Sequence, residues 1–377
     1  MYNQEEFPIV TRNNYQDAKG PHTKEQEAQH WNANPIRIAS YKKCCRGFDC
    51  QLKQITKALQ GVYPISHFLF LLLPFIRQKN NTMNHPESYT LLLKQTVEEL
   101  SDTSKMQGLF HQHRHGDPLP SVTALEEIIS LCRAVLFPGY YGKSTLNAVT
   151  VRYHIGMEVE RLFSLLTAQV QAGLCFGQQE EIHPGGPNCH AKAEAIAASL
   201  IALLPQVRRT LATDVEAAYL GDPAAQNYGE VISCYPVIRA LTCYRIAHEL
   251  YKLGVPLIPR IITELAHSET GIDIHPGAEI GEYFTIDHGT GVVIGATCII
   301  GKNVKLYQGV TLGAKSFPLD VNGNPVKNNP RHPILHDNVI VYSNATILGR
   351  ITVGEGAIVG ANMWVTHDVP AGQTLKS

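Results

Sequence analysis

Two short segments of the chain carry the residue types of an acid–base site. The first contains Asp273 in the sequence GIDIHP, and the second contains Asp287 and His288 in TIDHGTG. A histidine that takes up a proton must be held in one tautomer, and a carboxylate bonded to its other ring nitrogen does this. We therefore interpret His288 as a general base that Asp273 orients. The alternative is that both aspartates cap backbone amides in turns and that His288 is a surface histidine.

Other kinds of chemistry find little support. No serine or cysteine stands in a nucleophile motif beside His288, so direct transfer to an acceptor that the base activates is simpler than a covalent intermediate. No GxxxxGK or GxGxxG motif is present. The group Cys44, Cys45 and Cys50 lacks the paired CxxC spacing of a zinc site, and we expect no bound metal.

The elements that must position these residues repeat every six residues. A period of six fits neither the 3.6 residues of a helical turn nor the 2 of a strand, so each unit should be a short strand plus a turn. We predict that residues 269–377 form a parallel β-helix. Its interior would hold three runs of aliphatic residues: Ile274, Ile280 and Ile286; Ile294, Ile300, Leu306 and Leu312; and Leu335, Val341, Ile347, Val353, Val359 and Val365.

The repeat fails in two places, and polar residues gather at both. One failure is a phase shift of two residues at Asp287 and His288, and the other is an insertion at 314–333 that contains Arg331 and His332. The insertion is rich in Asn, Pro and Gly, so the solenoid should extrude it as a loop. A functional loop and a tolerated surface insertion both remain open at this point.

Residues 83–268 have helical apolar spacing and few strand signals, so they should form an α-helical domain. Breaks at Pro138-Gly139, 183–187 and Gly221-Asp222-Pro223 divide it into about six to eight helices. The last helices run into GIDIHP without a flexible linker, which places them against the first coils of the solenoid. The predicted fold class is therefore α+β multidomain, with an α-helical N-terminal domain followed by a hexapeptide-repeat solenoid.

Residues 1–82 show no sustained period, and we expect an extension that is disordered or dispensable. The formal net charge of −1 gives no basic field to recruit nucleic acid. The apolar stretch 65–76 is shorter than the roughly 20 residues that span a bilayer, and the N-terminus lacks the pattern of a signal peptide. We expect a cytoplasmic protein with reduced cysteines and without a membrane or nucleic-acid partner.

A set of short motifs follows in order along the last part of the chain: Gly221-Asp222-Pro223-Ala224, Tyr244-Arg245-Ile246-Ala247-His248, Asp273-Ile274-His275-Pro276, Asp287-His288, Gln308-Gly309-Val310-Thr311-Leu312-Gly313 and Arg331-His332-Pro333. With these motifs, the chain resembles serine O-acetyltransferase from about residue 221 to its end. The resemblance implies a left-handed parallel β-helix, a homotrimer with active sites between neighbouring solenoids, and often a dimer of trimers. It implies acetyl transfer from acetyl-CoA to the hydroxyl of L-serine, the first step of cysteine biosynthesis.

The resemblance also implies roles for individual residues. His288 would be the general base, oriented by Asp273. Asp222 and Asp287 would hold the ammonium group of the acceptor, and Arg331 would pair with its carboxylate. His332 would complete the pocket and support the oxyanion. For the coenzyme, position in the family pattern selects Gly313, Ala314, Lys315, Ser343 and Ala361, although small residues also suit ordinary solenoid turns.

The chain departs from the family pattern at three points. Ala296 replaces a frequent acid, Arg239 replaces a histidine, and Lys305-Leu306-Tyr307-Gln308 replaces a more aliphatic stretch. If Arg239 reaches the pocket, O-phosphoserine becomes an alternative acceptor; another is a hydroxylated compound such as a sugar. A solenoid that serves only assembly would have lost the base or its orienter, and both are present. The tail Gln373–Ser377 lacks the terminal isoleucine of family members that bind O-acetylserine sulfhydrylase, so we expect no stable complex with that enzyme.

Overall fold

The computed structural model describes residues 86–111, 119–142, 145–177, 187–316, 318–327 and 329–376. The predicted extension 1–82, with its cysteine group and its apolar stretch, lies outside the described residues. The chain divides into two compact units, Met1–Phe110 and His111–Ser377. In the first unit, the described part consists of helix α3 (Pro86–Ser101) and the short 3-10 helix η3 (Thr103–Lys105).

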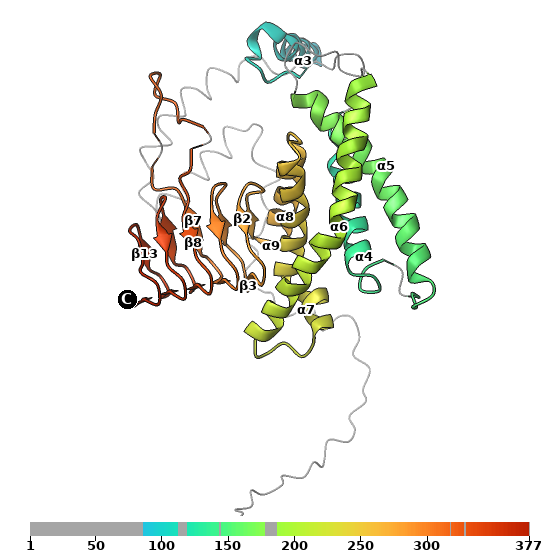
Figure 1. The fold of residues 1–377 in the computed structure, drawn as a ribbon. Helices are drawn as coiled ribbons and strands as arrows, with labels where there is room; N and C mark the ends of the chain where they lie inside the picture. The colour runs from blue at the N-terminus through green and yellow to red at the C-terminus, as the bar shows by residue number, and fades with distance from the viewer. Residues whose placement is uncertain are drawn as a thin grey trace, which may run out of the picture. The chain divides into compact units, whose positions relative to one another are not determined.

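The second unit begins with a helical domain (Figure 1). Local signals set the helix ends: the Ser121 side chain accepts from the N–H of Ala124 at 3.3 Å, and Gly271 stops the last helix with a φ of 71°. The predicted breaks coincide with helix ends, as at Gly221. The helices are α4 (Val122–Leu136), α5 (Val151–Gly177), α6 (Pro187–Gly221), α7 (Tyr228–Cys234), α8 (Pro236–Lys252) and α9 (Ile258–Thr270).

Helix α6 is long and apolar enough to cross a membrane by length and composition alone. One stripe of it nevertheless belongs to the core of the helical domain, since Leu200, Leu204 and Leu211 are buried there. Its Asp214 is also fully buried, and it forms an ion pair with Arg245 of α8. These contacts are those of a core helix in a folded domain.

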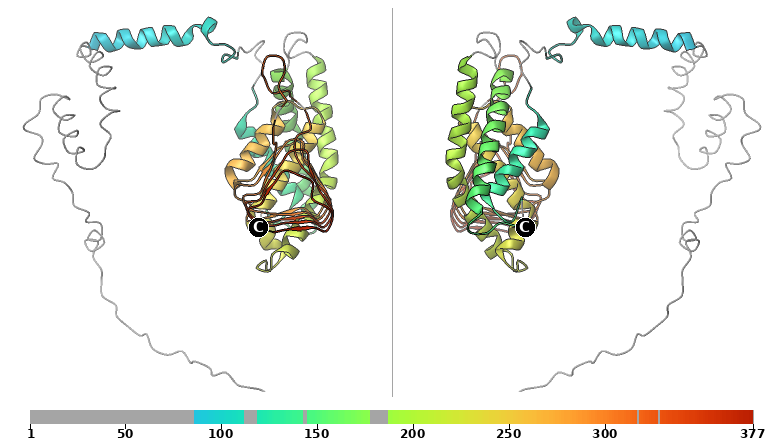
Figure 2. Two further views of the ribbon diagram at one scale, coloured as in Figure 1. Left: turned by 90° about the vertical axis from the view of Figure 1, so that its left-hand side faces the viewer. Right: turned by 90° about the vertical axis from the view of Figure 1, so that its right-hand side faces the viewer.

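The solenoid follows the helices and has three faces, each a parallel sheet. Viewed end-on, its coils superpose as a triangle (Figure 2). The first face contains β1 (Asp273–Ile274), β4 (Val293–Ile294), β7 (Thr311–Gly313), β10 (Thr346–Leu348) and β13 (Trp364–Val365). The second contains β2 (Glu279–Ile280), β5 (Ile299–Ile300), β8 (Ile334–Leu335) and β11 (Thr352–Val353). The third contains β3 (Thr285–Asp287), β6 (Lys305–Tyr307), β9 (Ile340–Val341), β12 (Ile358–Val359) and β14 (Thr374–Leu375).

The repeated aliphatic residues stack in register inside the triangle, as predicted. On the first face, Ile274 pairs with Ile294, Ile294 with Leu312 and Leu312 with Ile347, and all are at most 2% exposed. Each coil consists of three such units, one on each face. The phase shift at His288 adds its two residues to a turn between β3 and β4, and the insertion leaves the solenoid between β7 and β8. Both irregularities therefore fall at corners and leave the stacks intact.

Helices α6 and α8 cap the first coil, whose edge no earlier coil covers. Three side chains of α8 donate to its free carbonyl groups: the Tyr244 hydroxyl to Ala278 O at 2.6 Å, Arg245 to Ile280 O and Gly281 O, and His248 Nδ1 to Pro276 O. The Asp214 carboxylate of α6 accepts from the N–H of Phe284 at 3.1 Å. Pairing an open sheet edge in this way satisfies its backbone and blocks further strand addition.

Candidate active site

His288 stands in a backbone conformation that few residue types adopt. It directly follows β3, has a φ of 58°, and exposes 75% of its side chain. Later turns at the same corner use Gly309, Asn344 and Asn362 in this left-handed region, which suits glycine and asparagine. A histidine here costs roughly 1–2 kcal/mol of backbone energy. Such a cost is typical of residues kept for function.

The carboxylate nearest to His288 differs from the one expected. Nε2 of His288 lies 3.8 Å from Oδ1 of Asp287. No hydrogen bond or ion pair joins Asp273 to His288 in the described part of the chain. Oδ1 of Asp273 instead lies 3.7 Å from Nη1 of Arg260, on helix α9, which packs against β1. The orientation of His288 by Asp273 thus stays a prediction.

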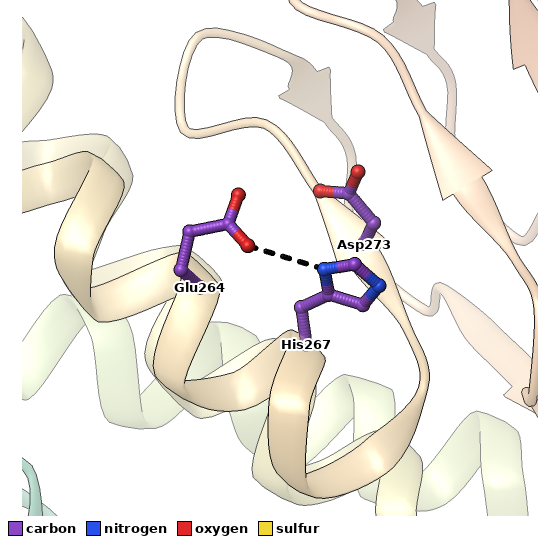
Figure 3. Close-up of side chains that lie close together, drawn as sticks. All are labelled: Glu264, His267 and Asp273. Carbon is purple, nitrogen blue, oxygen red and sulfur yellow. Dashed lines mark hydrogen bonds and ion pairs between the residues drawn. The ribbon is translucent and has the colours of Figure 1, made fainter. Parts of the chain in front are cut away.

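Asp273 also lies beside Glu264 and His267 of α9 (Figure 3). The three residues offer potential metal-ligand atoms within 4.8 Å of one another. Nδ1 of His267 is bonded to Oε2 of Glu264 at 3.2 Å. The Arg260 guanidinium contacts both carboxylates, so a positive charge already lies between them. We read the cluster as an ion-pair network at the junction of α9 and the solenoid.

Asp222 is held in a small polar cavity at the C-terminal end of α6. Its Oδ2 accepts from the Tyr235 hydroxyl at 2.5 Å, and its Oδ1 accepts from the N–H of Ala224 at 2.8 Å. The Tyr235 bond, more than the Ala224 bond, lowers the pKa of Asp222, so this carboxylate stays ionised. Asp287 and Lys305 line the same cavity. The cavity therefore joins both carboxylates expected to bind an ammonium group.

His332 is buried in a second polar cluster, next to the turn that follows β4. Its Nδ1 accepts from the backbone N–H of Thr297 at 3.1 Å, so the neutral ring carries its proton on Nε2. The Thr297 hydroxyl lies 2.9 Å from the same nitrogen. Burial, followed by the charge of Arg331, lowers the pKa of His332 to about 4. Near neutral pH, His332 is therefore an N–H donor without charge.

Close packing fixes the ring of His332. A Cβ atom added to Gly295 would lie only 2.0 Å from its Cδ2. The Thr297 hydroxyl accepts from the backbone N–H groups of both Arg331 and His332, at 2.9 and 3.2 Å. Arg350 donates to the carbonyl oxygens of Thr297 and His332 at 2.5 and 3.1 Å. Thr297 thus ties the end of the inserted loop to the turn after β4.

The polar residues occupy two corners of the triangle. We call the turns 288–292, 308–310, 342–345 and 360–363 the His288 corner, and the turns 275–278, 295–298 and 349–351 with the loop 314–333 the His332 corner. Asp222 and Asp287 adjoin the first corner, and Arg331 adjoins the second. The strands of the first face, two or three residues long in each coil, separate the two corners. One chain therefore does not bring His288 and His332 together.

The coenzyme candidates divide in the same way. Gly313, Ala314 and Lys315 lie where β7 leads into the His332 corner, whereas Ser343 and Ala361 lie in the His288 corner. In both corners, the coenzyme candidates lie on later coils than His288 and Thr297. They are therefore farther from the helical domain than those two residues. Hydrogen bonds connect successive turns of each column, as from Gly349 N–H to Gly313 O at 3.0 Å and from Asn362 N–H to Ser343 O at 2.9 Å.

Sequence reasoning missed four residues that shape the two clusters: Tyr235, Thr297, Lys305 and Arg350. Lys305 gave a signal, because it departs from the aliphatic family pattern. The others gave none, since their partners become neighbours only through the folding of α6 or of the inserted loop. Arg239, considered as a phosphate ligand, donates from Nε to Oε2 of Glu269 at 2.7 Å, so it already has an anionic partner.

No family model matches the chain, but individual known proteins do. A plasmid-encoded serine acetyltransferase of Synechococcus elongatus is 49% identical over 264 residues, which cover 69% of this chain and 82% of that protein. A serine acetyltransferase of Bacillus subtilis is 46% identical over 167 residues, 44% of this chain and 73% of the relative.

A solved structure is similar as well. The crystal structure of Entamoeba histolytica serine acetyltransferase 1, in complex with L-cysteine, superposes with a TM-score of 0.59 at 36% identity. The match covers 77% of this chain and 97% of the other. The predicted fold class, a helical domain followed by a left-handed parallel β-helix, is thereby confirmed.

Proposed function

The chain belongs to the serine acetyltransferase family, and from this premise we propose that it transfers an acetyl group from acetyl-CoA to the hydroxyl of L-serine. The products would be O-acetyl-L-serine and CoA, and serine acetylation is a step of cysteine biosynthesis. The observation that carries the proposal is the division of charge between the two corners. Carboxylates adjoin His288, while a guanidinium and a neutral imidazole donor adjoin the other corner, which suits the zwitterion and the developing oxyanion of the reaction.

In the proposed reaction, His288 removes the proton of the serine hydroxyl while the hydroxyl oxygen attacks the thioester carbonyl carbon. The carbonyl π electrons move onto its oxygen, and Nε2–H of His332 donates to that oxyanion. When the intermediate collapses, the C–S bond breaks. The CoA thiolate then leaves and takes the proton from His288. Asp222 and Asp287 hold the ammonium group, and Arg331 binds the carboxylate.

Direct transfer agrees with the state of Cys298, the one cysteine in the sequence of residues 269–377. Cys298 is fully buried in the second coil, and burial raises its pKa to about 12. A buried, protonated thiol is a poor nucleophile. We therefore propose no acyl-enzyme intermediate.

The separation of the two corners supports a site shared between copies of the chain. A cyclic homotrimer would bring the His288 corner of one copy against the His332 corner of the next at each interface. The coenzyme candidates divide between the same corners, so one slot between copies would serve both substrates. A dimer of such trimers remains part of the proposal.

Acetyl-CoA consumption with single acceptors tests the proposed function. L-Serine, O-phospho-L-serine, L-homoserine and maltose would each be supplied separately, and CoA release and the mass of the product would be measured. We expect turnover with L-serine and a product heavier by one acetyl group. Turnover with maltose alone would overturn the roles given to Asp222, Asp287 and Arg331. Turnover with O-phospho-L-serine alone would contradict the acceptor but retain the chemistry.

A further inference from the structure

Lys305 reaches from the solenoid into the cavity that contains Asp222 and Asp287. It opens β6, where Leu306 is buried in the core, so the side chains on either side of Leu306 point outward. Nζ of Lys305 donates to Gly221 O, at the end of α6, at 2.6 Å. It also lies 3.4 Å from Oδ2 of Asp287. Only 18% of the side chain is exposed.

The groups around this Nζ form a binding site for a primary ammonium ion. The Asp287 carboxylate supplies the opposite charge, and Gly221 O lies at the negative end of the helix dipole. The ring of Tyr307 presents its face, with its centroid 4.6 Å from Nζ. Asp222 follows Gly221 directly, and the charge of Lys305 is one of the smaller influences that lower its pKa.

Lys305 fills this site almost completely. The volume that remains among Asp222, Tyr235, Asp287 and Lys305 is about 10 Å³, at most the space of one water molecule. A second ammonium group therefore has no room while Nζ stays in place. The lysine can leave, since its stem is four flexible carbons long. Gly221 offers no side chain that would trap it.

We propose that Lys305 is an internal competitor of the acceptor: its Nζ occupies the ammonium position beside Asp222 and Asp287 until the ammonium group of the amino acid displaces it. The inference rests on the proposed function for the identity of the acceptor. It makes Lys305 a specificity-determining residue. An amino acid replaces one ammonium group by another and leaves the carboxylates paired, whereas a neutral sugar would leave them without a counter-ion.

Removing the charge of Lys305 tests the competition. In Lys305→Met the ammonium position is empty, so the KM for L-serine should fall about threefold to tenfold. In the wild type, serine binds only the fraction of molecules in which Nζ has left the site, and the apparent KM is the intrinsic value divided by that fraction. Lys305→Gln should lower the KM in the same way. Its amide can still donate a hydrogen bond to Gly221 O, so it controls for any loosening of that contact in Lys305→Met. The matched control is Lys302→Met. Lys302 is 64% exposed and pairs with Glu282 at 3.2 Å, so this change removes the same charge outside the cavity.

Ethylammonium chloride serves as a probe that is independent of turnover. Calorimetric titration should show millimolar binding to Lys305→Met and at least tenfold weaker binding to the wild type and to Lys302→Met. An unchanged or higher KM in both Lys305 variants, or equal ethylammonium binding in all proteins, would overturn the proposal. If the wild type turns over no L-serine, the proposed function fails. The ethylammonium titrations would still decide whether Lys305 blocks an ammonium site.

Discussion

His288 and His332 lie at different corners of the same solenoid, with the width of its first face between them. In the proposed reaction, each corner would supply half of what acetyl transfer to an amino acid requires. His288 would act as the base beside the carboxylates of Asp222 and Asp287, and the other corner would supply the guanidinium of Arg331 and the neutral imidazole of His332. The separation explains why a single chain presents two incomplete clusters, and it suggests that one copy completes the site of another.

Replacing His288 separates its chemistry from its backbone strain. We expect both His288→Asn and His288→Ala to lower kcat by roughly two to four orders of magnitude, the usual effect of losing a general base. Asparagine tolerates a φ of 58°, so His288→Asn should melt at or above the temperature of the wild type. CoA release and thermal denaturation measure the two effects. A kcat within about threefold of the wild type would remove His288 from the mechanism.

Gly295→Ala should displace His332 without unfolding the solenoid, because the new methyl group would lie 2.0 Å from Cδ2 of the ring. We expect kcat to fall at least about tenfold, since a displaced donor no longer faces the oxyanion. Gly156→Ala is the control, because no atom lies within 4 Å of its added Cβ. Equal activity in the two variants would show that the position of His332 is unimportant.

The stability of the protein should depend on pH through His332. Its pKa is about 4 in the folded chain and about 6.5 when unfolded, so the unfolded state alone takes up this proton between those values. The contribution of His332 to stability is complete above pH 6.5 and is lost as the pH falls toward 4. In His332→Asn, the difference between melting temperatures at pH 7 and pH 4.5 should therefore shrink. The same difference in both proteins would contradict the assigned burial.

Two arginines of helix α8 should differ in their effect on stability. Arg245 is 9% exposed and binds Asp214 through two hydrogen bonds, at 2.8 and 2.9 Å. Arg245→Met should cost about 3–5 kcal/mol of unfolding free energy, because it leaves the Asp214 charge buried and unpaired. Arg239 pairs with Glu269, which is 53% exposed, so Arg239→Met should cost about 1 kcal/mol or less. Chemical denaturation would measure both; equal losses would contradict the capping role of Arg245.

Much of this architecture could be predicted from the sequence, because the six-residue period determines which side chains enter the core. The period also located both irregularities, at His288 and before Arg331. It could not reveal that Lys305 reaches Gly221 or that Thr297 fixes His332, since these contacts depend on how α6 and the inserted loop return to the solenoid. Nor could it reveal that Arg260 of α9 lies 3.7 Å from Asp273; the orientation of His288 by Asp273 stays a prediction. Contacts between copies of the chain could not be predicted either, because they depend on surfaces of two folded chains.

Mixing two inactive variants tests most directly whether one active site uses His288 of one copy and His332 of another. His288→Asn and His332→Asn would be co-expressed with different tags, and mixed oligomers would be purified through both tags. In a cyclic trimer that contains both variants, one of the three interfaces pairs an intact His288 with an intact His332, so roughly one third of the sites are intact. The account predicts serine acetylation by the mixed oligomers at up to about that fraction of the wild-type rate, far above either variant alone. Mixed oligomers no more active than the parent variants would contradict the shared site.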